Sequence, residues 1–195
     1  MQRLLLSLGG FALAMALVPA TAQAGGFEHS VNGWTGWYAG VQLGVNSNSY
    51  DGFGSSSAFA QELTGGYNYQ VNSNLVLGGD LYTVWNTDTG HSVDSVPGYS
   101  ANYGSRGVGA EFLAGFAVDN FLPYLKVGYG HLNISGNLSG SASSARYGAG
   151  VMWRISANSG LLIQYTYQKA NIPNTLGNGD FKNSNITLGY NWFFD

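Results

Sequence analysis

The chain has 195 residues, a formal net charge of −3 and no cysteine. The absence of cysteine excludes a disulfide framework and a thiolate metal site, and the acidic balance gives no indication of a nucleic-acid partner. Charged residues make up only 9% of the chain, whereas a water-soluble domain usually carries about a quarter. This shortage of charge favours strands that alternate between a bilayer and a polar interior.

Residues 1–24 have the pattern of an export signal. Arg3 precedes an apolar run from Leu4 to Val18, and Ala22-Gln23-Ala24 provides a small-x-small cleavage motif. We therefore predict a signal peptide that directs export through the Sec route and is removed after Ala24. A membrane anchor is the alternative, but the run is short for a helix that spans a bilayer.

A short lead, residues 25–35, precedes eight segments that alternate at the period of a β-strand. In the first segment, 36–45, Trp37 and Val41 lie on one face, and Tyr38 and Gln42 lie on the other. The other segments with this alternation are 58–69, 75–85, 105–118, 121–132, 145–155, 160–169 and 185–194. No second apolar segment is long enough for a transmembrane helix.

The connections between these segments are alternately long and short. Stretches rich in Ser, Asn and Gly are predicted to be long loops: 46–57, 86–104, 133–144 and 171–183. The short connections are 70–74, 156–159 and Asp119-Asn120, which has the form of a two-residue hairpin turn. This alternation is typical of an even-stranded barrel with short periplasmic turns and longer extracellular loops.

We therefore predict an all-β fold, an eight-stranded antiparallel up-and-down transmembrane β-barrel formed by residues 36–195. The last segment, 185–194, is expected to pair with the first. Taken alone, that segment could equally be a strand of a soluble sandwich, and its one irregularity is Phe193 on the polar face. We expect Phe193 to point inward and to plug the periplasmic end of the barrel.

Charged residues test the assignment of the two faces independently of the apolar residues. The strand charges fall on the inner face: Glu62, Asp80, Glu111, Lys126, Arg146 and Arg154. Because an unpaired buried charge is strongly unfavourable, we predict an interior ion-pair network. A proton or ion path, or a catalytic carboxylate pair, is the functional alternative. Side chains just fill a barrel of eight strands, so an open pore is not expected.

Outward aromatic residues are predicted to form two girdles, as at the two interfaces of a membrane. The first girdle comprises Trp37, Tyr67, Tyr69, Phe116, Trp153, Trp192 and Phe194. The second comprises Phe59, Trp85, Tyr129, Tyr147, Tyr165 and Tyr167.

Several motifs occur in an order that resembles the opacity-type outer-membrane β-barrel family of Gram-negative bacteria, which includes small surface antigens and porin-like proteins. They are Gly36-Trp-Tyr-Ala-Gly-Val-Gln-Leu-Gly44, Gly65-Gly-Tyr-Asn-Tyr69, Leu77-Gly-Gly-Asp80, Asn120-Phe-Leu-Pro-Tyr124 and Lys126-Val-Gly-Tyr-Gly130. The resemblance implies the barrel fold, an integral location in the outer membrane, and contact with outer-membrane lipid and lipopolysaccharide. It implies no shared catalytic residues.

The final strand also resembles the signal read by the barrel-assembly machinery, which is therefore an expected partner during biogenesis. The residues that carry this resemblance are Thr187, Gly189, Trp192 and Phe194. The alternative is that the aromatic members of this set are simply lipid-facing.

An enzyme is the main rival class of function. Lipid A deacylases are small barrels with a lipid-facing His-x-Ser pair, but His131-Leu132-Asn133 places Asn where the nucleophile should be, and Ser135 lies further along. His29, His91 and His131 lie in separate segments without the spacing of a metal site. We therefore predict no catalytic, metal or cofactor-binding residue.

The favoured hypothesis is a non-enzymatic outer-membrane barrel whose polar loops serve envelope structure, adhesion or contact with a host or surface ligand. A narrow porin-like channel is the first alternative, based on the polar interior residues Gln42, Thr64, Gln164 and Thr166. An enzyme that modifies lipid A is the second.

Overall fold

The computed structural model describes residues 33–50, 53–92, 100–136, 140–174 and 177–194. The predicted signal peptide, the first part of the lead and Asp195 lie outside the described residues. In the part of the chain that is described, no helix has the length and apolar character needed to cross a membrane.

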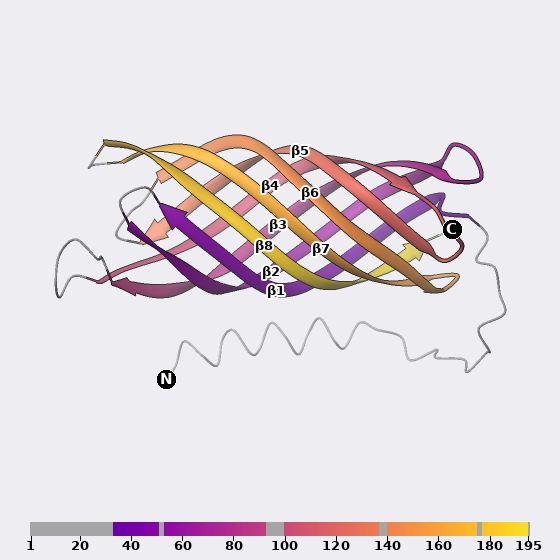
Figure 1. Ribbon diagram of the computed structural model, residues 1–195, viewed down its shortest axis with the longest axis horizontal. Helices are drawn as coiled ribbons and strands as arrows, with labels where there is room; N and C mark the ends of the chain where they lie inside the picture. Colours follow the sequence, from indigo (N-terminus) through magenta and orange to yellow (C-terminus); the bar gives the residue numbers. More distant parts are fainter. Residues whose placement is uncertain (1–32, 51–52, 93–99, 137–139, 175–176, 195) are drawn as a thin grey trace.

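Eight antiparallel strands form one closed barrel, in which neighbours in sequence are neighbours in space (Figure 1). The strands are β1 Gly36–Tyr50, β2 Phe53–Gln70, β3 Leu75–Ser92, β4 Ser100–Phe116, β5 Phe121–Gly136, β6 Gly140–Ser156, β7 Ser159–Asn174 and β8 Gly177–Phe194. The predicted fold class is confirmed.

The barrel closes through the pairing of its first and last strands. The ladder between β1 and β8 runs from Trp37 opposite Phe194 to Tyr50 opposite Phe181. Closure leaves no sheet edge with unpaired backbone groups, which is required of a β-structure surrounded by lipid. The predicted pairing of segment 185–194 with segment 36–45 is therefore confirmed.

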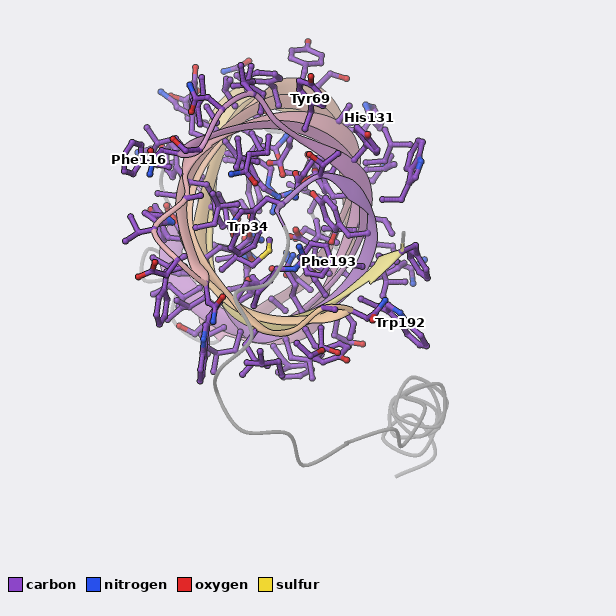
Figure 2. The ribbon with its side chains drawn as sticks, turned by 90° about the vertical axis from the view of Figure 1, so that its right-hand side faces the viewer. Trp34, Tyr69, Phe116, His131, Trp192 and Phe193 are labelled. Atoms are coloured by element: carbon purple, nitrogen blue, oxygen red, sulfur yellow. The ribbon has the colours of Figure 1, made fainter. Side chains whose placement is uncertain are left out.

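Side chains alternate between the interior and the outward face as predicted. Trp37 is 64% exposed, whereas Tyr38 beside it is 3% exposed. The aromatic residues of both predicted girdles point outward, and Figure 2 shows Tyr69, Phe116 and Trp192 around the outside of the barrel. A one-residue slip of any strand would reverse this arrangement, so the register is strongly specified.

The four predicted long loops are largely strand, and that part of the prediction was wrong. β1 continues to Tyr50 and β2 begins at Phe53, while β3 continues to Ser92 and β4 begins at Ser100. The low strand propensity of these Ser-, Asn- and Gly-rich stretches led to the prediction of loops. In the structure they are strands because pairing with the neighbouring strands satisfies their backbone groups. The same holds for the predicted loops 133–144 and 171–183.

The barrel therefore has two different ends. We call the end that carries the connections 71–74, 117–120 and 157–158 the turn end, and the opposite end the loop end. At the turn end, Val118 and Phe121 form a β-bridge around Asp119 and Asn120, and Asp119 adopts a left-handed φ of 50°. This bridge confirms the predicted two-residue hairpin turn. Asp suits the position because it tolerates a left-handed φ better than most residues.

Inward glycines let the wall of the barrel pack tightly. A Cβ added to Gly44 on β1 would lie 2.7 Å from the Cα of Thr187 and would overlap the carbonyl oxygen of Ile186, both on β8. A Cβ added to the outward Gly65 would meet only the carbonyl oxygen of Tyr38, at 3.8 Å. We call the junction between β1 and β8 the seam. Close approach of the two backbones at the seam requires glycine at position 44, whereas nothing comparable requires glycine at position 65.

The interior is filled in layers. An apolar cluster closes the turn end: Trp34, Tyr38, Val76, Leu113, Ala117, Leu122, Tyr124, Met152, Leu162 and Phe193. A second apolar cluster lies nearer the loop end: Leu132, Ile134, Ala170 and Phe181. Polar and charged side chains occupy the space between the clusters. The irregular residue Phe193 is only 1% exposed and lies in the first cluster, as predicted.

Candidate functional site

Five charged side chains meet in the middle of the barrel, one from each of the strands β2 to β6. Lys126 Nζ lies 2.6 Å from Asp80 Oδ2 and 3.5 Å from Glu111 Oε2. Arg146 Nη2 lies 2.5 Å from Glu62 Oε2, and its Nε lies 3.5 Å from Glu111 Oε1. Glu111 thus joins the two pairs, and we call these five residues the charged layer.

Neutral polar groups complete the charged layer. The Tyr38 hydroxyl donates to Asp80 at 2.7 Å, and the Gln164 amide donates to Glu62 at 3.1 Å. The Arg146 guanidinium also stacks on the ring of Tyr82, with 3.9 Å from Cζ to the ring centroid. Charges enclosed at low dielectric are tolerable when paired and hydrogen-bonded in this way.

Arg154 is placed outside the charged layer, although it was predicted to belong to the same network. It lies eight residues beyond Arg146 on β6, about 26 Å along the strand. Its guanidinium donates to the carbonyl oxygens of Gly33 and Ala157 and lies 4.2 Å from the ring centroid of Phe193. Arg154 therefore packs against the apolar cluster of the turn end through Trp34 and Phe193.

The end of the lead enters the barrel at this point, a placement that the sequence left open. Gly33 has a left-handed φ of 72°, which suits glycine, and Trp34 beyond it is 3% exposed. The Trp34 amide donates to Gln70 Oε1 at 2.8 Å, and its ring meets Phe193 edge to face at 6.3 Å between centroids. Figure 2 shows Trp34 and Phe193 inside the ring of strands.

Amide side chains line the interior between the charged layer and the loop end. Asn46 donates to Asn185 at 2.6 Å, and Asn183 donates to Asn48 at 2.8 Å. The residues that suggested a channel, Gln42, Thr64, Gln164 and Thr166, are all buried inside the barrel. Thr166 accepts from Arg146 at 3.1 Å. Hydrogen bonds from Asn185 to Thr166 and from Thr187 to Gln42 link further polar side chains across the interior.

The predicted assembly signal lies on both faces of β8. Thr187 points inward and donates to Gln42 at 2.8 Å, and Gly189 also faces the interior. Trp192 and Phe194 point outward and stack, with 5.8 Å between centroids. Recognition by the assembly machinery stays a prediction.

His131 has a partner that the sequence did not reveal. It lies opposite Ser143 on the neighbouring strand β6, and its Nδ1 lies 2.9 Å from Ser143 Oγ. Both side chains are exposed on the outward face, and Figure 2 shows His131 outside the barrel. No carboxylate among the described residues is recorded in contact with His131, and the described residues contain no group of three metal-ligating side chains.

Comparison with solved structures shows the same fold in other bacterial barrels. The Neisserial surface protein A is 18% identical, with a TM-score of 0.63, and the match covers 82% of this chain and 98% of that chain. The outer membrane protein OprG from Pseudomonas aeruginosa is 10% identical, with a TM-score of 0.58, and the match covers 82% and 96%. No match was found among curated protein sequences.

The sequence itself matches a family of barrel proteins over nearly its whole length. The model of the outer membrane protein beta-barrel domain matches residues 10–194. The match includes all eight strands and agrees with the closed barrel and its apolar outward face. The chain therefore belongs to the outer membrane protein beta-barrel domain family.

Proposed function

We propose that this outer-membrane barrel is not an enzyme and that its loop end is a contact surface for envelope structure, adhesion or a host ligand. In this proposal the chain is exported through the Sec route, and its last strand is read by the barrel-assembly machinery. The loop end then faces the outside of the cell, because short turns are periplasmic in barrels of this kind.

The observation that carries this proposal is the extension of the strands beyond the apolar band. On β1, for example, outward Val45 gives way to Ser47 and Ser49, while Asn46 and Asn48 are buried and hydrogen-bonded. A polar outward face cannot lie in hydrocarbon without cost. The extension therefore suits a rigid platform that holds polar residues above the membrane.

Shortening the strand extensions at the loop end tests the proposal. Residues 87–104 can be replaced by Asn-Gly, because Asn86 and Ser105 are direct partners in the β3–β4 ladder and a two-residue turn joins such partners. Vesicles with the intact protein are expected to bind host cells or matrix proteins more than empty vesicles do, and trimming should lower this binding. Equivalent trimming of the other three hairpins shows which one binds.

Folding of each trimmed variant is checked by the shift of its gel mobility on boiling. If the intact protein bound no more than empty vesicles, or if all four trimmed variants bound like the intact protein, the proposed contact surface would be wrong.

The channel alternative predicts conductance, and we expect none. Ion flow would have to cross the apolar cluster at the turn end and then the paired charges of Lys126 and Arg146. Planar-bilayer recording of the folded protein should therefore remain at the level of the bare bilayer. Reproducible single-channel steps would instead support the porin-like alternative.

The enzyme alternative depends on the contact between His131 and Ser143. A serine needs a base within hydrogen-bond reach to act as a nucleophile, and this pair meets that requirement at 2.9 Å. We nevertheless expect no release of fatty acid from lipid A, because no acid orients the imidazole among the described residues. Release that disappears in both His131→Ala and Ser143→Ala would establish the enzyme.

A further inference from the structure

Among the residues that the structure describes, lysines and arginines on the outward face occur only near the loop end. The sequence has seven lysines and arginines, of which Arg3 lies in the predicted signal peptide. Lys126, Arg146 and Arg154 are buried inside the barrel. The remaining three, Arg106, Lys169 and Lys182, lie on outward positions of the extended strands. With the loop end outside the cell, as proposed above, these positions lie toward the headgroups of the outer leaflet.

Two of these cations face each other directly. Lys169 on β7 and Lys182 on β8 are partners in the ladder, an arrangement that is unfavourable for like charges. Asp180 lies 2.6 Å from Lys169 Nζ, and hydrogen bonds from Lys169 and Asn171 lower its pKa, so it is ionised at neutral pH. Lys169, Lys182 and Asp180 together keep one net positive charge.

An apolar groove lies on the same side of the barrel. It has a volume of about 780 Å³ and is lined in part by Ala114, Phe116, Leu125, Ala149, Tyr165 and Ile186. The small residues Ala114 and Ala149 leave room between bulkier neighbours, since Leu125 pairs with both of them across the sheet. Phe116 stands at the outer surface near the turn end (Figure 2).

The groove leads toward the lysine pair. Its residues form a continuous row in which Ala149 pairs with Tyr165, and Tyr165 pairs with Ile186. Lys169 and Lys182 lie four residues beyond Tyr165 and Ile186, about 13 Å along the strands. The intervening surface is polar, because the Tyr165 hydroxyl donates to Ser184 Oγ at 3.3 Å. A lysine side chain can also extend back toward the membrane.

We propose that this face of β4 to β8 binds one acylated, phosphorylated glycolipid of the outer leaflet. An acyl chain fills the groove, the sugar lies against Tyr165 and Ser184, and a phosphate lies between Lys169 and Lys182. Charge complementarity favours this occupant, because a phosphate relieves the repulsion between the two lysines. The ion pair with Asp180 competes with the phosphate for Lys169.

Native mass spectrometry of the folded barrel in detergent, titrated with lipid A, tests the site. Lys169→Gln with Lys182→Gln is expected to weaken binding by about 25-fold, since each lysine near an anionic surface contributes about fivefold. Ala149→Leu should weaken binding by filling the groove. Asp180→Asn should strengthen binding, because it releases Lys169.

Matched controls use outward residues that neither line the groove nor belong to the lysine pair. Arg106→Gln removes an outward cation on β4, and Ala39→Leu enlarges an outward alanine on β1; both should bind like the unchanged protein. Lipid A without phosphates should bind as weakly as the double lysine variant, and inorganic phosphate alone should not compete at equal concentration. Equal affinity for lipid A with and without phosphate, or unchanged binding by the double lysine variant, would overturn the proposal.

Discussion

Replacing Arg146 by methionine is expected to lower the free energy of unfolding by about 3–5 kcal/mol, the usual cost of removing one partner of a buried ion pair. Methionine fills much of the volume of the arginine but leaves Glu62 and Glu111 without their guanidinium partner. Urea unfolding of the barrel in lipid vesicles, followed by tryptophan fluorescence, measures the change.

Two further variants separate the ion pairs from general effects of substitution. Lys169→Met breaks an ion pair whose lysine is 49% exposed, so the expected loss is below about 1 kcal/mol. Adding Glu62→Gln to Arg146→Met should recover part of the stability, because a neutral amide then replaces one of the two carboxylates that have lost their guanidinium partner. A urea midpoint for Arg146→Met equal to that of the unchanged protein would show that the charged layer does not stabilise the barrel.

Gly44→Ala is expected to be the most harmful of the single-methyl substitutions in the wall. The added methyl group would overlap backbone atoms of Ile186 and Thr187, and backbone cannot rotate away as a side chain can. Overpacking of this kind costs about 1–3 kcal/mol and sometimes more. The folded fraction after refolding, read from gel mobility before and after boiling, and the urea midpoint measure the effect.

Gly65→Ala provides the control for this prediction with the same chemical change. Its new methyl group points outward and meets only the carbonyl oxygen of Tyr38, at 3.8 Å. Since glycine within a strand is less favourable than alanine by about 0.5–1 kcal/mol, this substitution should be neutral or stabilising. Equal losses at Gly44 and Gly65 would contradict a role for close backbone approach at the seam.

The alternation of side chains predicted most of the fold because it depends only on the period of a strand. Once the neighbours Leu63, Leu81 and Tyr147 are assigned to lipid, period two turns the residues before them inward. These residues are Glu62, Asp80 and Arg146, and the structure brings them into one layer. The strand ends were not predictable in the same way. Whether Asn48 lies in a loop or a strand depends on its partner Asn183, which is distant in sequence.

Contacts between side chains on different strands could not be predicted from the sequence pattern either. Period two places His131 on the outward face but does not say which residue of β6 lies opposite, so Ser143 was missed. Arg154 was grouped with the charged layer because the alternation assigns a side chain to the inner or outer face but does not give its height along the barrel axis. The entry of Trp34 into the interior depends on contacts with Gln70 and Phe193 that no local pattern encodes.

The seam between β1 and β8 has a consequence for how the barrel forms. The hydrogen bond from Thr187 to Gln42 joins residues that are 145 positions apart, so the entropy of closing that loop must be overcome before either strand has both neighbours. Folding dominated by such distant pairs is slow. A nascent barrel without β8 exposes two unpaired edges, which makes arrival of the C-terminal strand the event that commits the chain to its native topology.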